Sequence, residues 1–109
     1  MGSPATDIMP FKEWTIALGD ARIYIWRQTQ AGVVTSFAVV LIVWTGDEWE
    51  CVTRYDCAHG FPHRDVLGKR AGLLYKQTFP TFTLEKVFHH AIRDCQENHE
   101  KHTEFFKTH

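Results

Sequence analysis

Residues 33–44 form the apolar run VVTSFAVVLIVW, and this stretch decides the fold. The run is rich in β-branched side chains and too short to cross a bilayer, so it predicts a buried β-strand. A tight turn at Gly46-Asp47 follows and leads into EWECVTRY at residues 48–55, which predicts a second strand. The two strands would form an antiparallel hairpin within a sheet.

Two further strand-like segments precede this hairpin. Residues 11–18 and 21–28 flank Gly19-Asp20, a two-residue turn that favours a hairpin. Residues 69–79 mix apolar and basic side chains, and we expect either a short fifth strand or an edge protected by lysines. The segment order predicts a four- to five-stranded antiparallel meander.

One long helix is predicted at residues 83–107, with Thr83 as its N-cap. Packing of this C-terminal helix against the meander gives an α+β fold class. We expect residues 1–109 to form a single domain, with residues 1–10 as a flexible N-terminus. The apolar stripe of the helix comprises Leu84, Val87, Phe88, Ala91, Ile92 and Cys95.

The turns also predict which side chains share a sheet face. If the TQAG loop has an even length, Ile23 and Ile25 lie on the same face as Ala38, and a one-residue error there would exchange the faces. One helix cannot cover both apolar faces, so we expect a homodimer through the apolar sheet face. The expected opposite face carries Tyr24, Trp26, Phe37, Val39, Leu41, Val43 and Val52.

Composition narrows the class of protein. The chain has 109 residues, 44% hydrophobic and 14% aromatic, which excludes a disordered protein. Its net charge of −1 gives no broad basic field that would attract nucleic acid, although this net charge does not exclude a local basic patch. Three cysteines without regular spacing, and no signal-peptide pattern in residues 1–10, predict a cytoplasmic protein without a membrane segment.

A polar cluster, RYDCAHGFPHRDVLG, occupies residues 54–68. Two histidines can act as acid and base near neutral pH, and an arginine can hold a phosphate through paired hydrogen bonds. With an aspartate to orient a histidine, this set predicts metal-independent cleavage of an RNA phosphodiester. The alternative is a polar turn whose histidines cap backbone groups. The candidate catalytic residues are His59, His63, Arg64, Asp65 and Asp56.

Basic and aromatic neighbours of the cluster are candidates for substrate binding, because single-stranded RNA needs both cations and stacking rings. The expected substrate-binding residues are Arg54, Tyr55, Lys69 and Arg70.

Metal binding is a weaker interpretation, and no cofactor is expected. His59 and His63 have H-x3-H spacing that zinc would accept, but no second ligand pair accompanies them. Cys95, His99 and His102 lie on one side of the predicted helix, where plain amphipathicity explains them equally well.

The segment VTRYDCAHGFPHRDVLG resembles TumE-type toxins of bacterial toxin–antitoxin modules and related small uncharacterised prokaryotic domains. In that group a strand ends in an RYD-x-AHG-like segment, and a His-Arg or His-His pair follows. The resemblance implies a small cytoplasmic α+β toxin acting on RNA, with an antitoxin partner. This chain departs from the pattern at Cys57 and in its His-rich helix. The matching residues are Arg54, Tyr55, Asp56, Ala58, His59, Gly60, His63 and Arg64.

Two functions therefore follow from the residues and the resemblance together. The first is a ribonuclease-like toxin component that uses the loop residues. The second is a non-enzymatic dimeric interaction module that binds a protein or nucleic acid.

Overall fold

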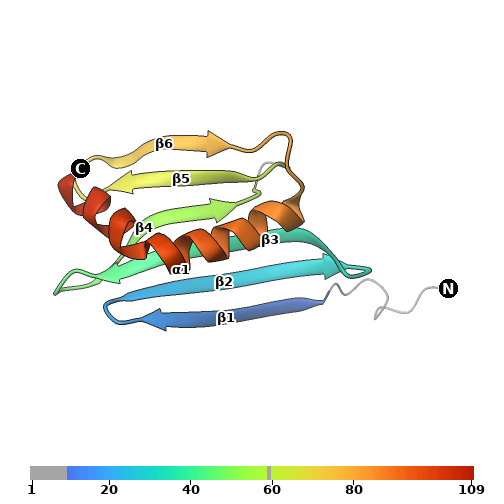
Figure 1. Ribbon diagram of the computed structural model, residues 1–109, viewed down its shortest axis with the longest axis horizontal. Helices are drawn as coiled ribbons and strands as arrows, with labels where there is room; N and C mark the ends of the chain where they lie inside the picture. Colours follow the sequence, from blue (N-terminus) through green and yellow to red (C-terminus); the bar gives the residue numbers. More distant parts are fainter. Residues whose placement is uncertain (1–9, 59) are drawn as a thin grey trace.

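The computed structural model describes residues 10–58 and 60–109. A six-stranded antiparallel sheet runs in chain order, and one long helix lies across it (Figure 1). The predicted α+β class and meander are confirmed, but the sheet has six strands rather than four to five. The elements are β1 (Phe11–Leu18), β2 (Ala21–Gln30), β3 (Val33–Trp44), β4 (Trp49–Asp56), β5 (His63–Gly68), β6 (Gly72–Thr78) and α1 (Leu84–Thr108).

The strand that sequence reasoning missed is β5, whose HRDVLG sequence is polar enough to resemble a loop. It pairs with β4 so that Asp65 lies opposite Arg54 and His63 lies opposite Asp56. Oppositely charged side chains on neighbouring strands stabilise such a pairing. The polar pattern that indicated a loop therefore serves strand pairing instead.

Helix α1 begins where predicted, because the Thr83 hydroxyl accepts a hydrogen bond from the Lys86 amide at 3.2 Å. Its other end docks on the β5–β6 turn, where the Lys69 amide donates to the Phe106 carbonyl at 2.9 Å. Figure 1 shows the helix crossing one face of the sheet towards this turn. The helix backbone is interrupted at Asn98, whose φ of −120° and ψ of 16° are not helical.

The assignment of side chains to faces differs from the expectation. Ile23 lies opposite Leu41 and Ile25 lies opposite Val39, so these four residues share the face that α1 covers. The predicted grouping of Ile23 and Ile25 with Ala38 is wrong, because a shift in register after Gln28 inserts one residue and exchanges the faces. The core beneath α1 includes Ile23, Ile25, Phe37, Val39, Leu41, Val43, Tyr55, Val87, Phe88, Ala91 and Cys95.

The opposite face of the sheet is the open face, which none of the described helices or strands covers (Figure 1). Several large aromatic side chains lie on it, including Tyr24 on β2 and the cross-strand pair Trp44 and Trp49, whose ring centroids are 5.7 Å apart. The Arg22 guanidinium lies 4.4 Å from the Trp49 ring centroid. Within residues 10–58 and 60–109, no helix has the length and apolar character needed to span a membrane. Of residues 1–10, which we expected to form a flexible N-terminus, residues 1–9 lie outside the described ranges.

Candidate functional site

The alternation of β5 divides the predicted catalytic cluster between the two faces of the sheet. His63 and Asp65 point to the open face, whereas Arg64 points towards α1, because successive strand side chains face opposite sides. His59 lies outside the described residues. The structure therefore places Arg64 apart from His63.

On the open face, Asp65 lies between two cations. The Arg54 guanidinium donates to its carboxylate at 2.6 Å and the Lys76 ammonium at 2.7 Å. Asp65 is only 1% exposed. Burial opposes its ionisation, but the hydrogen bonds from Lys76 and Arg54 outweigh burial and lower the pKa of Asp65. This carboxylate therefore stays charged and ties β4, β5 and β6 together.

His63 joins the same network. Its Nε2 lies 2.8 Å from one Asp56 carboxylate oxygen and 3.8 Å from Asp65, while the Arg54 Nε lies 3.3 Å from the other Asp56 oxygen. The structure thus brings four predicted residues together. The His63 side chain is only 4% exposed, which leaves its ring little surface for a substrate.

Arg64 belongs to a separate site on the helix-covered face, which we call the α1 cleft. Its Nε donates to the Thr53 hydroxyl at 2.9 Å, and its Nη2 donates to Nδ1 of His102 at 3.3 Å. Thr53 in turn donates to the main-chain carbonyl of Asp65 at 2.8 Å. Sheet and helix together therefore hold the guanidinium in one orientation.

Asp94 on α1 is the acceptor at the centre of the α1 cleft. It accepts from the Tyr55 hydroxyl at 2.8 Å and from the Asn98 amide at 2.9 Å, and it lies 2.9 Å from Nε2 of His102. Burial opposes its ionisation, but the bonds from His102, Tyr55 and Asn98 prevail and hold the pKa of Asp94 below its usual range. Burial and the bond to Asp94 raise the pKa of Tyr55.

These contacts define the state of the His102 ring. Since Arg64 can only donate, Nδ1 must accept, and the ring proton resides on Nε2, where it donates to Asp94. An aspartate that fixes the tautomer of a histidine is the arrangement used in acid–base catalysis. The arginine beside Nδ1 adds a donor for an anionic group.

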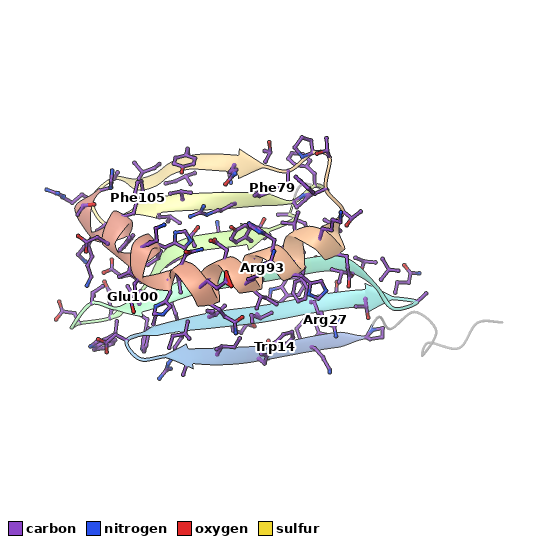
Figure 2. The ribbon with its side chains drawn as sticks, viewed as in Figure 1. Trp14, Arg27, Phe79, Arg93, Glu100 and Phe105 are labelled. Carbon is purple, nitrogen blue, oxygen red and sulfur yellow. The ribbon has the colours of Figure 1, made fainter. Side chains whose placement is uncertain are left out.

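The α1 cleft is a hollow of about 420 Å³ between α1 and the β5–β6 hairpin. Figure 2 shows Phe105 near the C-terminal end of α1 and Phe79 beyond the end of β6, at opposite ends of this side of the molecule. The lining of the α1 cleft is Arg64, Val66, Tyr75, Asp94, Asn98, Lys101, His102 and Phe105.

The predicted substrate-binding residues are distributed over several places. Arg54 lies in what we call the open-face network, which comprises Arg54, Asp56, His63, Asp65 and Lys76. Tyr55 is only 1% exposed, so Tyr55 supports Asp94 from below rather than presenting its ring to solvent. Lys69 pairs with Glu50 at 2.6 Å near one end of the sheet, and Arg70 is exposed in the β5–β6 turn. The structure does not bring these four residues to one surface.

The metal interpretation of the helix receives no geometric support. His102 lines the α1 cleft, whereas His99 lines a separate depression with Leu18 and Val43, and Cys95 is completely buried. Burial raises the pKa of the Cys95 thiol to about 12. Among residues 10–58 and 60–109, no three His, Cys, Asp or Glu side chains converge as metal ligands. The zinc alternative at His63 involves His59, which is outside these ranges.

Sequence reasoning missed Asp94 and Asn98, and it considered His102 only as a metal ligand or a continuation of the helix stripe. One signal was available, because Asp94, Asn98 and His102 recur every four residues within the predicted helix. Thr53 carried no such signal, since its role depends on the register between β4 and β5.

The fold and the cleft define a class of protein: a small α+β domain with an antiparallel sheet, one covering helix, and a His-Asp-Arg cleft between them. The chain belongs to the family described as domain of unknown function DUF7718, whose model matches residues 9–109. No curated protein and no solved structure matches the chain significantly.

Proposed function

We propose that this protein is a metal-independent ribonuclease that works in the α1 cleft. The observation that carries the proposal is the hydrogen-bonded chain from Asp94 through His102 to Arg64, which lines an open hollow. The proposal keeps the RNA chemistry expected from the sequence but places it on the other face of the sheet. There His102 is partly exposed, with 17% of its side chain accessible, whereas His63 is almost fully enclosed.

The chemistry follows from the donors and acceptors in the α1 cleft. A bound phosphate would draw the Arg64 guanidinium away from His102, because a charged oxygen is a stronger acceptor than a neutral imidazole. Nδ1 of His102 would then take the proton of the 2′-hydroxyl, and the 2′-oxygen would bond to phosphorus. The P–O5′ bond breaks, and the Lys101 ammonium protonates the leaving oxygen. The products are a 2′,3′-cyclic phosphate and a 5′-hydroxyl.

A cleavage assay tests this proposal with matched histidine variants. Single-stranded RNA with a 5′ label is incubated with the protein in excess chelator, and the termini of the products are identified. We expect the wild type to cleave the RNA. The cleavage rate of His102→Ala should be lower by at least about a hundredfold, which is the usual contribution of a general base. His99→Ala, on the other side of α1, should keep full activity. A wild type that never cuts RNA would overturn the proposal.

The resemblance to TumE-type toxins supports a biological setting for this chemistry. We propose that the protein acts as a cytoplasmic toxin whose antitoxin partner blocks it. Expression of the wild type in a bacterial host should then slow growth, and His102→Ala should not. Growth arrest that persists in His102→Ala but disappears in His63→Ala would return the catalytic role to the loop predicted from the sequence.

A second candidate function is a non-enzymatic module that dimerises. The observation that favours it is the open face, where Tyr24, Trp44 and Trp49 remain 37%, 42% and 36% exposed. Exposed aromatic surface of this kind is typical of contacts between proteins. Under this alternative a second copy covers the open face, and sedimentation should show a dimer that Trp44→Arg dissociates. A dimer without any ribonuclease activity would favour this function over the first.

A further inference from the structure

We propose that a second hollow, beside the N-terminal half of α1, binds a base of the single-stranded RNA whose phosphate occupies the α1 cleft. This inference rests on the proposed function, because it names the part of the substrate that the same enzyme would hold. The second hollow measures about 630 Å³. We call it the aromatic groove, and its principal lining residues are Gln77, Phe79, Phe82, Val87, His90 and Arg93.

The rings of the aromatic groove offer faces and edges for stacking. Phe79 lies 6.5 Å from Phe82 and 6.4 Å from His90, measured between ring centroids. Below it, the buried ring of Tyr55 stacks on Phe79 at 6.1 Å with an interplanar angle of 25°. Phe79 is therefore held in place from the core, while Phe82 is 54% exposed and accessible to a ligand. Aromatic side chains of this kind are the usual platforms for unpaired bases.

The aromatic groove and the α1 cleft are connected through shared neighbours. The Tyr55 ring contacts His90 at 5.9 Å in the groove, while its hydroxyl donates to Asp94 in the cleft. Gln77 of the groove lies opposite Arg64 of the cleft across the β5–β6 pairing. Both hollows therefore lie on the same side of α1, so that one extended ligand can occupy both.

The length of the combined surface suits a strand rather than a single nucleotide. His90 and His102 are twelve residues apart, which corresponds to about 18 Å along a helix. Arg93 lies between them and is labelled at mid-helix in Figure 2. A strand lying along α1 would place one phosphate at Arg64 and a base from another nucleotide of the same strand among the rings.

The local charge also favours a polyanion, although the whole chain is slightly negative. Lys86 and Arg93 line the aromatic groove, and both are exposed. The one carboxylate of its lining, Glu85, already accepts a hydrogen bond from the Val34 amide at 3.1 Å and lies 3.2 Å from His89. The side-chain amide of Gln77 offers both a donor and an acceptor for a base edge. An apolar peptide would not use these cations.

Binding of an uncleavable RNA analogue tests the inference separately from catalysis. The probe is a labelled 2′-O-methyl oligonucleotide, which lacks the attacking hydroxyl, and its partner is an abasic strand of equal length and charge. We expect Phe82→Ala to weaken binding of the first probe by about fivefold to a hundredfold, the range for loss of one base–aromatic stack. The abasic strand should bind more weakly to the wild type and should be insensitive to Phe82→Ala.

The matched control is Phe11→Ala, because Phe11 is also 54% exposed but lies on β1, away from both hollows. It should not change the affinity for either probe. Equal affinity of the wild type for both probes, no binding of either probe, or equal effects of Phe11→Ala and Phe82→Ala would overturn the inference. Base-dependent binding without any cleavage would overturn only the proposed function. Cleavage without base-dependent binding would overturn only this inference.

Discussion

Asp94 and His102 lie within hydrogen-bond distance, 2.9 Å, although eight residues separate them along α1. In an unbroken helix eight residues rise about 12 Å, which is at the limit of what these two side chains can bridge. The non-helical backbone at Asn98 lies midway between them and brings the two turns together. Asn98 also donates to Asp94, so one residue both bends the helix and holds the carboxylate.

Replacement of Asn98 by alanine should remove both effects of this residue. Alanine favours the helical backbone and removes the amide donor, so His102 should move away from Asp94. We expect cleavage to fall about tenfold or more, equivalent to about 1.4 kcal/mol, while the melting temperature changes little. Activity assays and thermal unfolding measure the two quantities. Gln96→Ala, an exposed change on the same helix, is the control, and equal activity in both variants would contradict the role of the bend.

The open-face network predicts a large loss of stability when Asp65 is neutralised. Asp65→Asn leaves Arg54 and Lys76 without their shared carboxylate and changes the hydrogen bonding of a buried group. We expect a loss of about 1–3 kcal/mol in the free energy of unfolding, measured by urea titration. Glu50→Gln, which breaks the more exposed pair with Lys69, should have little effect. Similar stability in the two variants would mean that the network does not stabilise the sheet.

Acid should destabilise the protein through Asp65 and Asp94, whose pKa values are both lowered in the folded state. A carboxyl group whose pKa is lowered by folding stabilises the folded state when the pH is above the unfolded pKa of about 3.9. This stabilisation is lost as the pH falls from that value towards the lower pKa of the folded state. Asp94→Asn should therefore be less stable than the wild type at pH 7, but its free energy of unfolding should fall less on acidification than that of the wild type. Urea titrations at pH 7, 4 and 3 test this, and parallel pH profiles for the two proteins would disprove it.

Close contact between Gly68 and the end of α1 predicts a sensitive position in the β5–β6 turn. A Cβ atom at residue 68 would lie 2.7 Å from the main-chain carbon of His109, so the last turn of the helix would have to move. Gly68→Ala should therefore loosen the C-terminal turn, seen as faster amide exchange around Phe106. Gly72→Ala is not a suitable control, because Gly72 has a positive φ and a side chain there would strain the backbone. Ala71→Ser, in the same turn, serves as the control. Unchanged exchange in Gly68→Ala would show that the contact is not restrictive.

The element types were predictable because they depend on local patterns. β-Branched runs separated by Gly-Asp turns predicted the first four strands, and an apolar stripe after Thr83 predicted the helix. The register was not predictable, since a single inserted residue near Gln28 changes which residues of β3 share a face with Ile23 and Ile25. Strand β5 was not predicted either, because its sequence is polar. Its charged side chains have their partners on β4, and only the pairing of the two strands shows this.

The candidate site, like the fold, has features that the sequence predicted and features that only the tertiary structure revealed. The sequence pointed to Arg64 and to a basic, aromatic neighbourhood, but it grouped Arg64 with His63, its neighbour in the chain. Strand alternation sends these two side chains to opposite faces, and the partner of Arg64 is His102, thirty-eight residues away. No spacing rule connects residues whose meeting depends on where the helix crosses the sheet.

By itself, the sequence determined the antiparallel meander, the covering helix and the residue types available for acid–base chemistry, because hydrophobic periodicity and turn residues act over short distances. Only the tertiary structure decided which face each strand turns towards α1 and which histidine meets an aspartate and an arginine. The physical reason is that register and helix docking are set by packing over the whole core. A shift of one residue reverses a face without any change in local preference.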